Sequence, residues 1–113
     1  MHRDIKSANL FLTKDGILKL GDLNVSKVAK GMLNTQTGTP YYASPEVWQD
    51  RPYDMKSDIW SVGCVLYEMC ALQPPFQAKD MRGLHKKIVE GIVPSLPPPY
   101  TKDLSHMVKL LLQ

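Results

Sequence analysis

Four residues near the start of the chain have the types and the spacing that phosphoryl transfer requires. His2, Arg3 and Asp4 are consecutive, and Asn9 follows five residues after the aspartate, so the stretch fits H-R-D-x-x-x-x-N. With each residue type at about 5% usage, such a match arises by chance on the order of once in 10⁵ windows. A carboxylate on this loop could accept the proton of an attacking hydroxyl, and an amide oxygen could hold Mg²⁺ against phosphate groups.

The residues after Asn9 predict a β-hairpin that would bring a second oxygen ligand to the same place. Two short apolar runs, 10–12 and 17–20, flank an Asp-Gly dipeptide at 15–16, which is a strong signal for a tight turn. Asn9 stands where this hairpin begins, and Asp22 stands just past its end. The two side chains are therefore predicted to meet as a metal-binding pair, with a solvated loop aspartate as the alternative for Asp22.

Two later segments extend the pattern in the same order. Residues 21–24 (G-D-L-N) occupy the place of the D-F-G segment of protein kinases, and residues 44–46 (S-P-E) are close to the A-P-E that closes a kinase activation segment. Together with H-R-D-x-x-x-x-N, these segments resemble the C-terminal lobe of a eukaryotic protein kinase. The strings at 38–46 and 53–64 most resemble the NIMA-related (Nek) serine/threonine kinases, and the resemblance covers nearly the whole chain.

The resemblance implies roles for the residues around the catalytic loop. Asp4 would be the catalytic base, and Lys6 would offset charge on the transferred phosphoryl group and indicate serine or threonine as the acceptor. Asn9 and Asp22 would hold Mg²⁺, and Phe11 would belong to the apolar column beneath the adenine of ATP. The alternatives are a structural aspartate for Asp4, a solvated side chain for Lys6 and an ordinary core residue for Phe11.

The resemblance also implies regulatory and substrate-binding residues. Thr39 would hydrogen-bond the catalytic base and Lys6 beside the bound substrate, with an ordinary turn residue as the alternative. Arg3 would receive a phosphorylated residue of the activation loop, because a guanidinium pairs with phosphate through two hydrogen bonds. Thr35 matches the phosphorylation position of the family, and Thr37 is the nearby rival.

Apolar periodicity predicts three helices in the rest of the chain. Residues 57–72 are apolar on most sides, which indicates a buried helix, and Ser57 is a suitable N-cap. Further helices are predicted over 79–90 and 101–112, separated by a proline-rich connector over 93–100.

The resemblance also implies how the central helix is placed relative to the loop that carries Asp4. Asp58, at the start of the central helix, would hold the backbone of the catalytic loop; a charge favoured at a helix N-terminus is the alternative. Residues 25–43 lack sustained periodicity and predict a long surface loop. The predicted fold class is α+β: a mainly α-helical, kinase-like C-lobe with a small β-hairpin next to the catalytic loop.

Composition limits the number of domains and argues against two classes of partner. With 113 residues, 43% of them hydrophobic and 22% charged, the chain is at most one ordinary globular domain. A net charge of +3 without a basic run predicts no nucleic-acid partner, and the absence of a long apolar stretch predicts no membrane partner. Cys64 and Cys70 lack metal-ligand spacing and predict buried thiols in a reducing compartment.

Parts of a kinase domain are absent from the 113 residues. The sequence contains neither a G-x-G-x-x-G loop nor a V-A-I-K strand. Residues 1–113 are therefore expected to be a partial protein kinase domain that works on ATP and protein substrates together with an N-lobe in a longer parent chain. Alone, the segment is expected to have negligible activity; the alternative is a non-catalytic lobe that acts as a binding module. The resemblance suggests a cytoplasmic location, with the centrosome or the base of a cilium as alternative locations.

Overall fold

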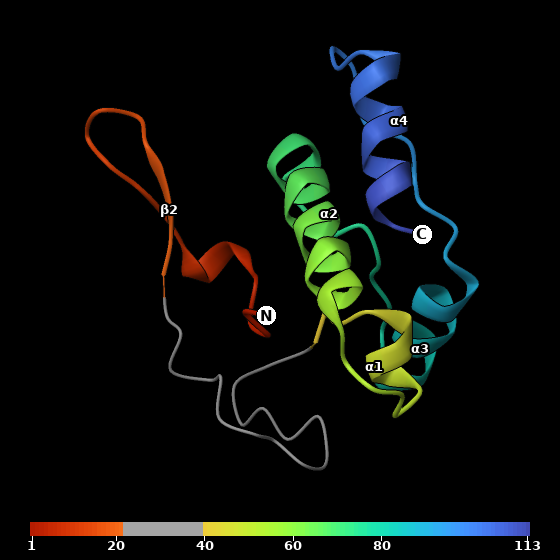
Figure 1. Ribbon diagram of the computed structural model, residues 1–113. Coiled ribbons are helices and arrows are strands. Elements are labelled where there is room, and N and C mark those ends of the chain that lie inside the picture. The colour runs from red at the N-terminus through yellow and green to blue at the C-terminus, as the bar shows by residue number, and fades with distance from the viewer. Residues whose placement is uncertain (22–39) are drawn as a thin grey trace.

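Helices dominate the part of the chain that the structure, a computed structural model, describes, namely residues 1–21 and 40–113 (Figure 1). One short antiparallel sheet precedes them. In chain order the elements are the 3-10 turn η1 (Ser7–Asn9), the strands β1 (Leu10–Leu12) and β2 (Leu18–Leu20), and the helices α1 (Pro45–Trp48), α2 (Met55–Ala71), α3 (Met81–Glu90) and α4 (Lys102–Leu111). The predicted α+β class is confirmed, with the hairpin next to the loop that carries H-R-D.

The strands β1 and β2 form the predicted hairpin. They pair antiparallel, with Leu10 opposite Leu20 and Leu12 opposite Leu18. Gly16 lies in the turn at a φ of +78°, a left-handed conformation that glycine adopts without steric cost. The strands are largely exposed, and the hairpin extends away from the helices in Figure 1. Because a lone hairpin is marginally stable in water, its position depends on the bonds at its base.

The central helix α2 begins earlier than the sequence predicted. Asp54, not Ser57, is the N-cap: its Oδ1 accepts hydrogen bonds from the amides of Lys56 at 2.7 Å and Ser57 at 3.2 Å. The Ser57 hydroxyl accepts in return from the Asp54 amide at 3.4 Å, which completes a capping box. The prediction of Ser57 as N-cap was wrong because an equally suitable acceptor stands three residues before it and reaches the first free amides of the helix.

One face of α2 is buried and the opposite face is exposed. Trp60, Cys64 and Tyr67 face the core, whereas Ile59 is 46% exposed and Met69 is 59% exposed. The helices α3 and α4 lie on the buried side (Figure 1). The prediction of burial on most sides was therefore wrong for the Ile59–Met69 face, since the described helices pack against the other one.

The core joins α2 to the two helices that follow it. The ring of Phe76 stacks on that of Trp60, with centroids 5.6 Å apart and planes 8° apart. Gly63 allows a close approach to α4, because an added Cβ there would lie 2.8 Å from the Cβ of Leu111. The buried residues of the cluster are Trp60, Cys64, Tyr67, Phe76, Leu84, Ile88, Val108 and Leu112.

The remaining helices have clear boundaries. The helix α3 begins after Asp80, whose carboxylate accepts from the Gly83 amide at 2.7 Å, and ends at Gly91 in a left-handed conformation. The helix α4 begins after Thr101, whose hydroxyl accepts from the Leu104 amide at 3.2 Å. Both helices lie within the ranges predicted from the sequence. In the described ranges, no helix is long and apolar enough to cross a membrane.

Candidate active site

The loop that carries H-R-D is fastened to the first turn of α2. Asp58 accepts a hydrogen bond from the backbone amide of His2 at Oδ2, over 2.8 Å, and one from the amide of Arg3 at Oδ1, over 3.0 Å. The expectation that Asp58 holds the backbone of this loop is confirmed. The alternative is compatible with it, because Asp58 also lies in the first turn of the helix, where a negative charge is favourable.

Hydrogen bonds keep Asp58 ionised. Burial alone would raise the pKa of Asp58, but hydrogen bonds from Tyr53 and from the Arg3 and His2 amides hold this pKa below its usual value. The Tyr53 hydroxyl donates to Oδ1, the same oxygen that accepts from Arg3. Sequence reasoning missed Tyr53, because nothing in the local pattern shows which carboxylate a tyrosine hydroxyl reaches.

The backbone at Arg3 has an unusual conformation. Its φ is +68°, in the left-handed region, which costs a residue other than glycine about 1–2 kcal/mol. The hydrogen bond from the Arg3 amide to Asp58 helps to offset this cost. Because Arg3 directly precedes Asp4, this conformation sets the direction in which the loop presents the Asp4 carboxylate.

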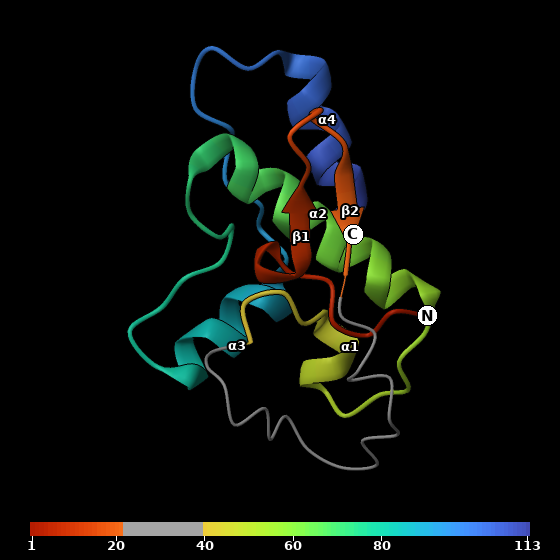
Figure 2. The ribbon, with the colours of Figure 1, turned by 90° about the vertical axis from the view of Figure 1, so that its left-hand side faces the viewer.

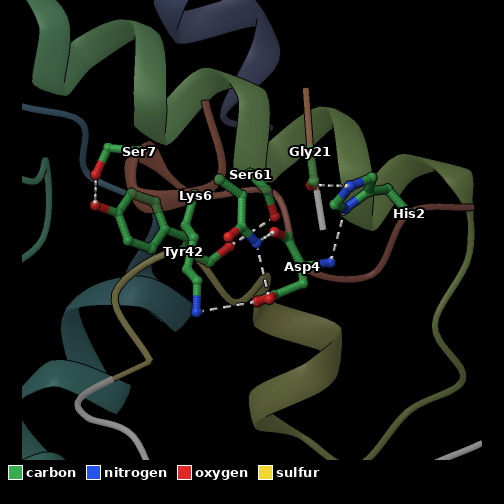
Figure 3. Close-up of polar contacts among 8 residues, drawn as sticks. His2, Asp4, Lys6, Ser7, Gly21, Tyr42 and Ser61 are labelled. Atoms are coloured by element: carbon green, nitrogen blue, oxygen red, sulfur yellow. Dashed lines mark hydrogen bonds and ion pairs between the residues drawn. The ribbon is translucent and has the colours of Figure 1, made fainter. Parts of the chain in front are cut away.

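Asp4, Lys6 and Asn9 lie together, as the sequence predicted. Figure 3 shows the Lys6 side chain directed toward Asp4. The buried Asn9 side chain donates from Nδ2 to the Asp4 carbonyl at 2.8 Å and to Asp4 Oδ2 at 2.9 Å. Lys6 Nζ lies 3.5 Å from the other carboxylate oxygen, Oδ1. The turn η1 spans Ser7–Asn9 and returns the chain toward Asp4. Each oxygen of the Asp4 carboxylate is thus matched by one polar group, which fixes the orientation of the carboxylate.

His2 links the loop to the end of the hairpin. Its Nε2 lies 3.1 Å from the Gly21 carbonyl and its Nδ1 lies 3.3 Å from the Asp4 amide. A carbonyl can only accept and an amide N–H can only donate, so the geometry assigns the neutral ring with hydrogen on Nε2. The Gly21 amide donates to the Asn9 carbonyl at 2.8 Å. The residue before Asp22 is therefore held beside both Asn9 and His2.

A second polar chain ties the loop to the middle of α2. The Tyr42 hydroxyl donates to Glu68 Oε2 at 2.6 Å. Ser7 Oγ lies 2.9 Å from the same hydroxyl (Figure 3). Because the one hydroxyl hydrogen of Tyr42 goes to the carboxylate, Ser7 is the donor in its bond to Tyr42. Ser61 Oγ donates to the Tyr42 carbonyl at 2.9 Å. Burial and the hydrogen bond to Glu68 raise the pKa of Tyr42 to about 12. Sequence reasoning missed this chain as well.

Several predicted site residues lie outside the described residues or apart from the loop. Asp22, Thr35, Thr37 and Thr39 fall in the range that the structure does not describe. The Phe11 ring is 55% exposed and lies against Gly21, where an added Cβ would be 2.6 Å from the ring. Arg3 is exposed. Its predicted contact with a phosphorylated residue stays a prediction, because Thr35 and Thr37 lie outside the described residues.

The donor set is suitable for a hard cation. The Asn9 nitrogen is used in bonds to Asp4, which leaves its amide oxygen as the potential ligand, and oxygen ligands are those that Mg²⁺ prefers. Within residues 1–21 and 40–113, no group of three or more His, Cys, Asp or Glu side chains could hold a metal ion. The predicted pair of Asn9 and Asp22 thus depends on a residue that the structure does not describe.

The described residues also form a cavity of about 420 Å³ that no residue of the H-R-D loop lines. It lies between the end of α2, the loop that follows it and the end of α3. Aromatic and proline side chains line it, among them Tyr67, Pro75, Phe76 and Pro94. None of the predicted catalytic or metal-binding residues lines this cavity.

Known proteins share this sequence pattern. A family model for the protein kinase domain matches residues 1–113. The chain is 47% identical to serine/threonine-protein kinase Nek1 of Mus musculus, over 98% of the chain and 10% of that protein. It is 44% identical to Nek4 of the same species, over 99% of the chain and 14% of that protein. With Nek3 of Mus musculus, the identity is 47% over 100% of the chain and 23% of that protein. The chain thus spans less than a quarter of the length of these relatives.

Proposed function

This chain belongs to the protein kinase family, and we propose that it carries the catalytic loop of a serine/threonine kinase that transfers the γ-phosphate of ATP to protein hydroxyls. The observation that carries this proposal is the arrangement around Asp4. Its two carboxylate oxygens face Asn9 at 2.9 Å and Lys6 at 3.5 Å, on a loop fastened to α2 through Asp58. The serine/threonine kinases among the relatives support the same reaction class.

Asp4 is proposed as the base of this reaction. Because both carboxylate oxygens already have polar neighbours, Asp4 has one defined orientation in which to accept the proton of a serine or threonine hydroxyl. The Lys6 ammonium group stands beside it and would supply positive charge where the transferred phosphoryl group accumulates negative charge. In this proposal, Asp4 orients the acceptor hydroxyl and Lys6 stabilises the transferred phosphoryl group.

Protein kinases as a family use ATP and magnesium, and we propose that Asn9 and Asp22 hold the metal in this chain. When bound, magnesium neutralises charge on the phosphates. Support comes from the position of Gly21, whose amide bonds the Asn9 carbonyl at 2.8 Å, so that Asp22 follows directly after a residue fixed beside Asn9. The buried position of Asn9, 5% exposed, also gives its amide oxygen a fixed direction.

Transfer of labelled phosphate from ATP to a generic serine/threonine peptide tests the proposal. In the full-length protein, Asp4→Asn keeps the size of the side chain but removes the base, so transfer should fall by about 10²- to 10⁴-fold. Asp15→Asn is the matched control, because Asp15 lies exposed in the hairpin turn. Equal transfer by wild type and Asp4→Asn would overturn the assignment of Asp4. A tyrosine peptide should be phosphorylated far more slowly than the serine/threonine peptide.

The alternative is that the segment binds partners without catalysis. One observation favours it: large apolar side chains are exposed on the hairpin and on α2, among them Leu12 at 72% and Met69 at 59%. Assaying the segment 1–113 beside the full-length protein separates the two proposals. We expect negligible transfer from the segment alone. Absence of Asp4-dependent transfer from the full-length protein as well would favour the binding module.

A further inference from the structure

We propose that Tyr53 is a positioning residue for phosphoryl transfer, which acts through Asp58 on the backbone that presents Asp4. The proposal rests on the kinase function proposed above. Tyr53 begins the string 53–64 that carries the family resemblance, but the sequence predicted no catalytic, metal-binding or regulatory role for it. It lies in the segment between α1 and α2, next to the N-cap residue Asp54. Its hydroxyl is the one side-chain donor to Asp58 in the described part of the chain.

The Asp58 carboxylate is shared between Tyr53 and the catalytic loop. Oδ1 accepts from the Tyr53 hydroxyl and from the Arg3 amide at 3.0 Å, and Oδ2 accepts from the His2 amide at 2.8 Å. Without the Tyr53 bond, both oxygens would be constrained from the loop side alone. The tyrosine therefore adds a constraint on the carboxylate from outside the loop, and so helps to fix the point to which the loop is attached.

A displacement of the Asp58 carboxylate would displace Arg3, the residue that directly precedes the proposed base Asp4. Arg3 is in the left-handed region at a φ of +68°, and its amide bond to Asp58 helps to hold it there. Asp4 follows directly, and its own amide donates to His2 Nδ1 at 3.3 Å. Arg3, which precedes Asp4, and His2, whose ring accepts from the Asp4 amide, are thus both fastened to the carboxylate that Tyr53 orients. Loss of the Tyr53 hydroxyl should loosen Arg3 and His2 together.

The protonation states of the pair suit this role. Burial, together with the bond to Asp58, raises the pKa of Tyr53 well above its usual value, so the hydroxyl keeps its hydrogen and remains a donor. Asp58 stays ionised and remains an acceptor. The groups that face Asp58 are the Tyr53 hydroxyl and the amides of His2 and Arg3.

Kinetics of the full-length protein test the proposal through Tyr53→Phe, which removes the hydroxyl and keeps the ring. We expect kcat to fall about tenfold, with KM for ATP and for the peptide unchanged, because a displaced base affects the transfer step rather than binding. Tyr100→Phe, a partly exposed tyrosine of the proline-rich connector, is the matched control. In the double variant with Asp58→Asn, Tyr53→Phe should add little further loss, because both changes act on one contact.

Amide hydrogen exchange gives a readout that does not depend on activity. In Tyr53→Phe, the His2 and Arg3 amides should exchange faster, whereas the amides of α3 and α4 should be unaffected. Unchanged kcat in an active wild-type background would overturn the proposal for Tyr53 alone. A loss of folding in Tyr53→Phe, or a fall in kcat that is fully additive with Asp58→Asn, would also overturn it. Absence of Asp4-dependent transfer in the wild type would instead overturn the proposed kinase function.

Discussion

The loop around Asp4 and the core between α2, α3 and α4 lie on different sides of the same helix (Figures 1 and 2). On the core side, α2 contributes large apolar side chains such as Trp60 and Tyr67, which are 3% and 4% exposed. On the loop side, it contributes the carboxylates of Asp58 and Glu68, which accept hydrogen bonds from segments distant in sequence. One helix therefore holds the two regions by two kinds of interaction.

This difference indicates that apolar burial determines the stability of the fold, whereas hydrogen bonds determine the position of the loop. Burial of apolar surface is roughly proportional to area and tolerates small shifts, so the core supplies stability. Hydrogen bonds depend on distance and angle, so the bonds to Asp58 and Glu68 define where the loop stands while each adds little net stability. Changes in the core should lower stability most, and changes in the loop bonds should lower activity most.

The largest expected effect comes from the core. Phe76→Ala removes a ring that is 2% exposed and stacked on Trp60, and should lower the free energy of unfolding by about 3–5 kcal/mol. Phe11→Ala, the matched change on the exposed hairpin, should cost about 1 kcal/mol or less. Urea denaturation measures both. Equal losses would mean that the hairpin contributes as much stability as the core.

An intermediate effect on stability, with a large effect on activity, is expected from Asp58→Asn. Loss of the charged acceptor should reduce the free energy of unfolding by about 1–3 kcal/mol. Displacement of the loop should lower phosphate transfer by about a hundredfold. A stability loss with normal activity would contradict the role of Asp58 in positioning the loop.

The pH dependence of Asp58 has a definite sign. Its pKa in the folded state is below the ordinary value of 3.8, so its contribution is fully present above about pH 4 and is lost as the pH falls through the lower, folded-state pKa. Acid denaturation of Asp58→Asn should therefore lack this part of the pH dependence. The difference in stability between wild type and variant should shrink below pH 4.

The smallest effect is expected from Ser7→Ala. It removes one donor from Tyr42 but leaves the bond from Tyr42 to Glu68, so the free energy of unfolding should fall by about 0.5–1.5 kcal/mol. Ser7→Thr keeps a hydroxyl and should restore most of the loss. Thermal denaturation compares the three proteins. A loss as large as that of Phe76→Ala would show that a single loop bond contributes as much stability as a buried ring of the core.

Much of the fold could be predicted because its signals are local. The Asp-Gly turn gave the hairpin, apolar periodicity gave α3 and α4, and the spacing of Asp4 and Asn9 predicted two side chains that the structure places 2.9 Å apart. The position of Asp58 beneath the loop came from a family resemblance, and two hydrogen bonds confirm it.

The misses have physical causes. Asp54 and Ser57 are both good N-caps, and the sequence alone does not decide which one reaches the free amides. The contacts of Tyr53 and Tyr42 depend on where a hydroxyl ends after the chain has folded, and amphipathic patterns carry no information on that point. The exposure of Ile59 and Met69 depends on which elements pack against α2, and apolar character alone does not reveal them.

The bonds at the base of the hairpin have a practical consequence for engineering. Gly21 and Asn9 are joined by their backbones, and strand pairing fixes the positions between Leu10 and Leu20, so the far turn does not determine where the ends lie. Residues 14–16 are exposed, and lengthening a flexible loop adds only about 0.6 kcal/mol for each doubling of its length. An epitope tag or a fluorescent label inserted there would report on the protein while leaving the spacing of Asp4 and Asn9 intact.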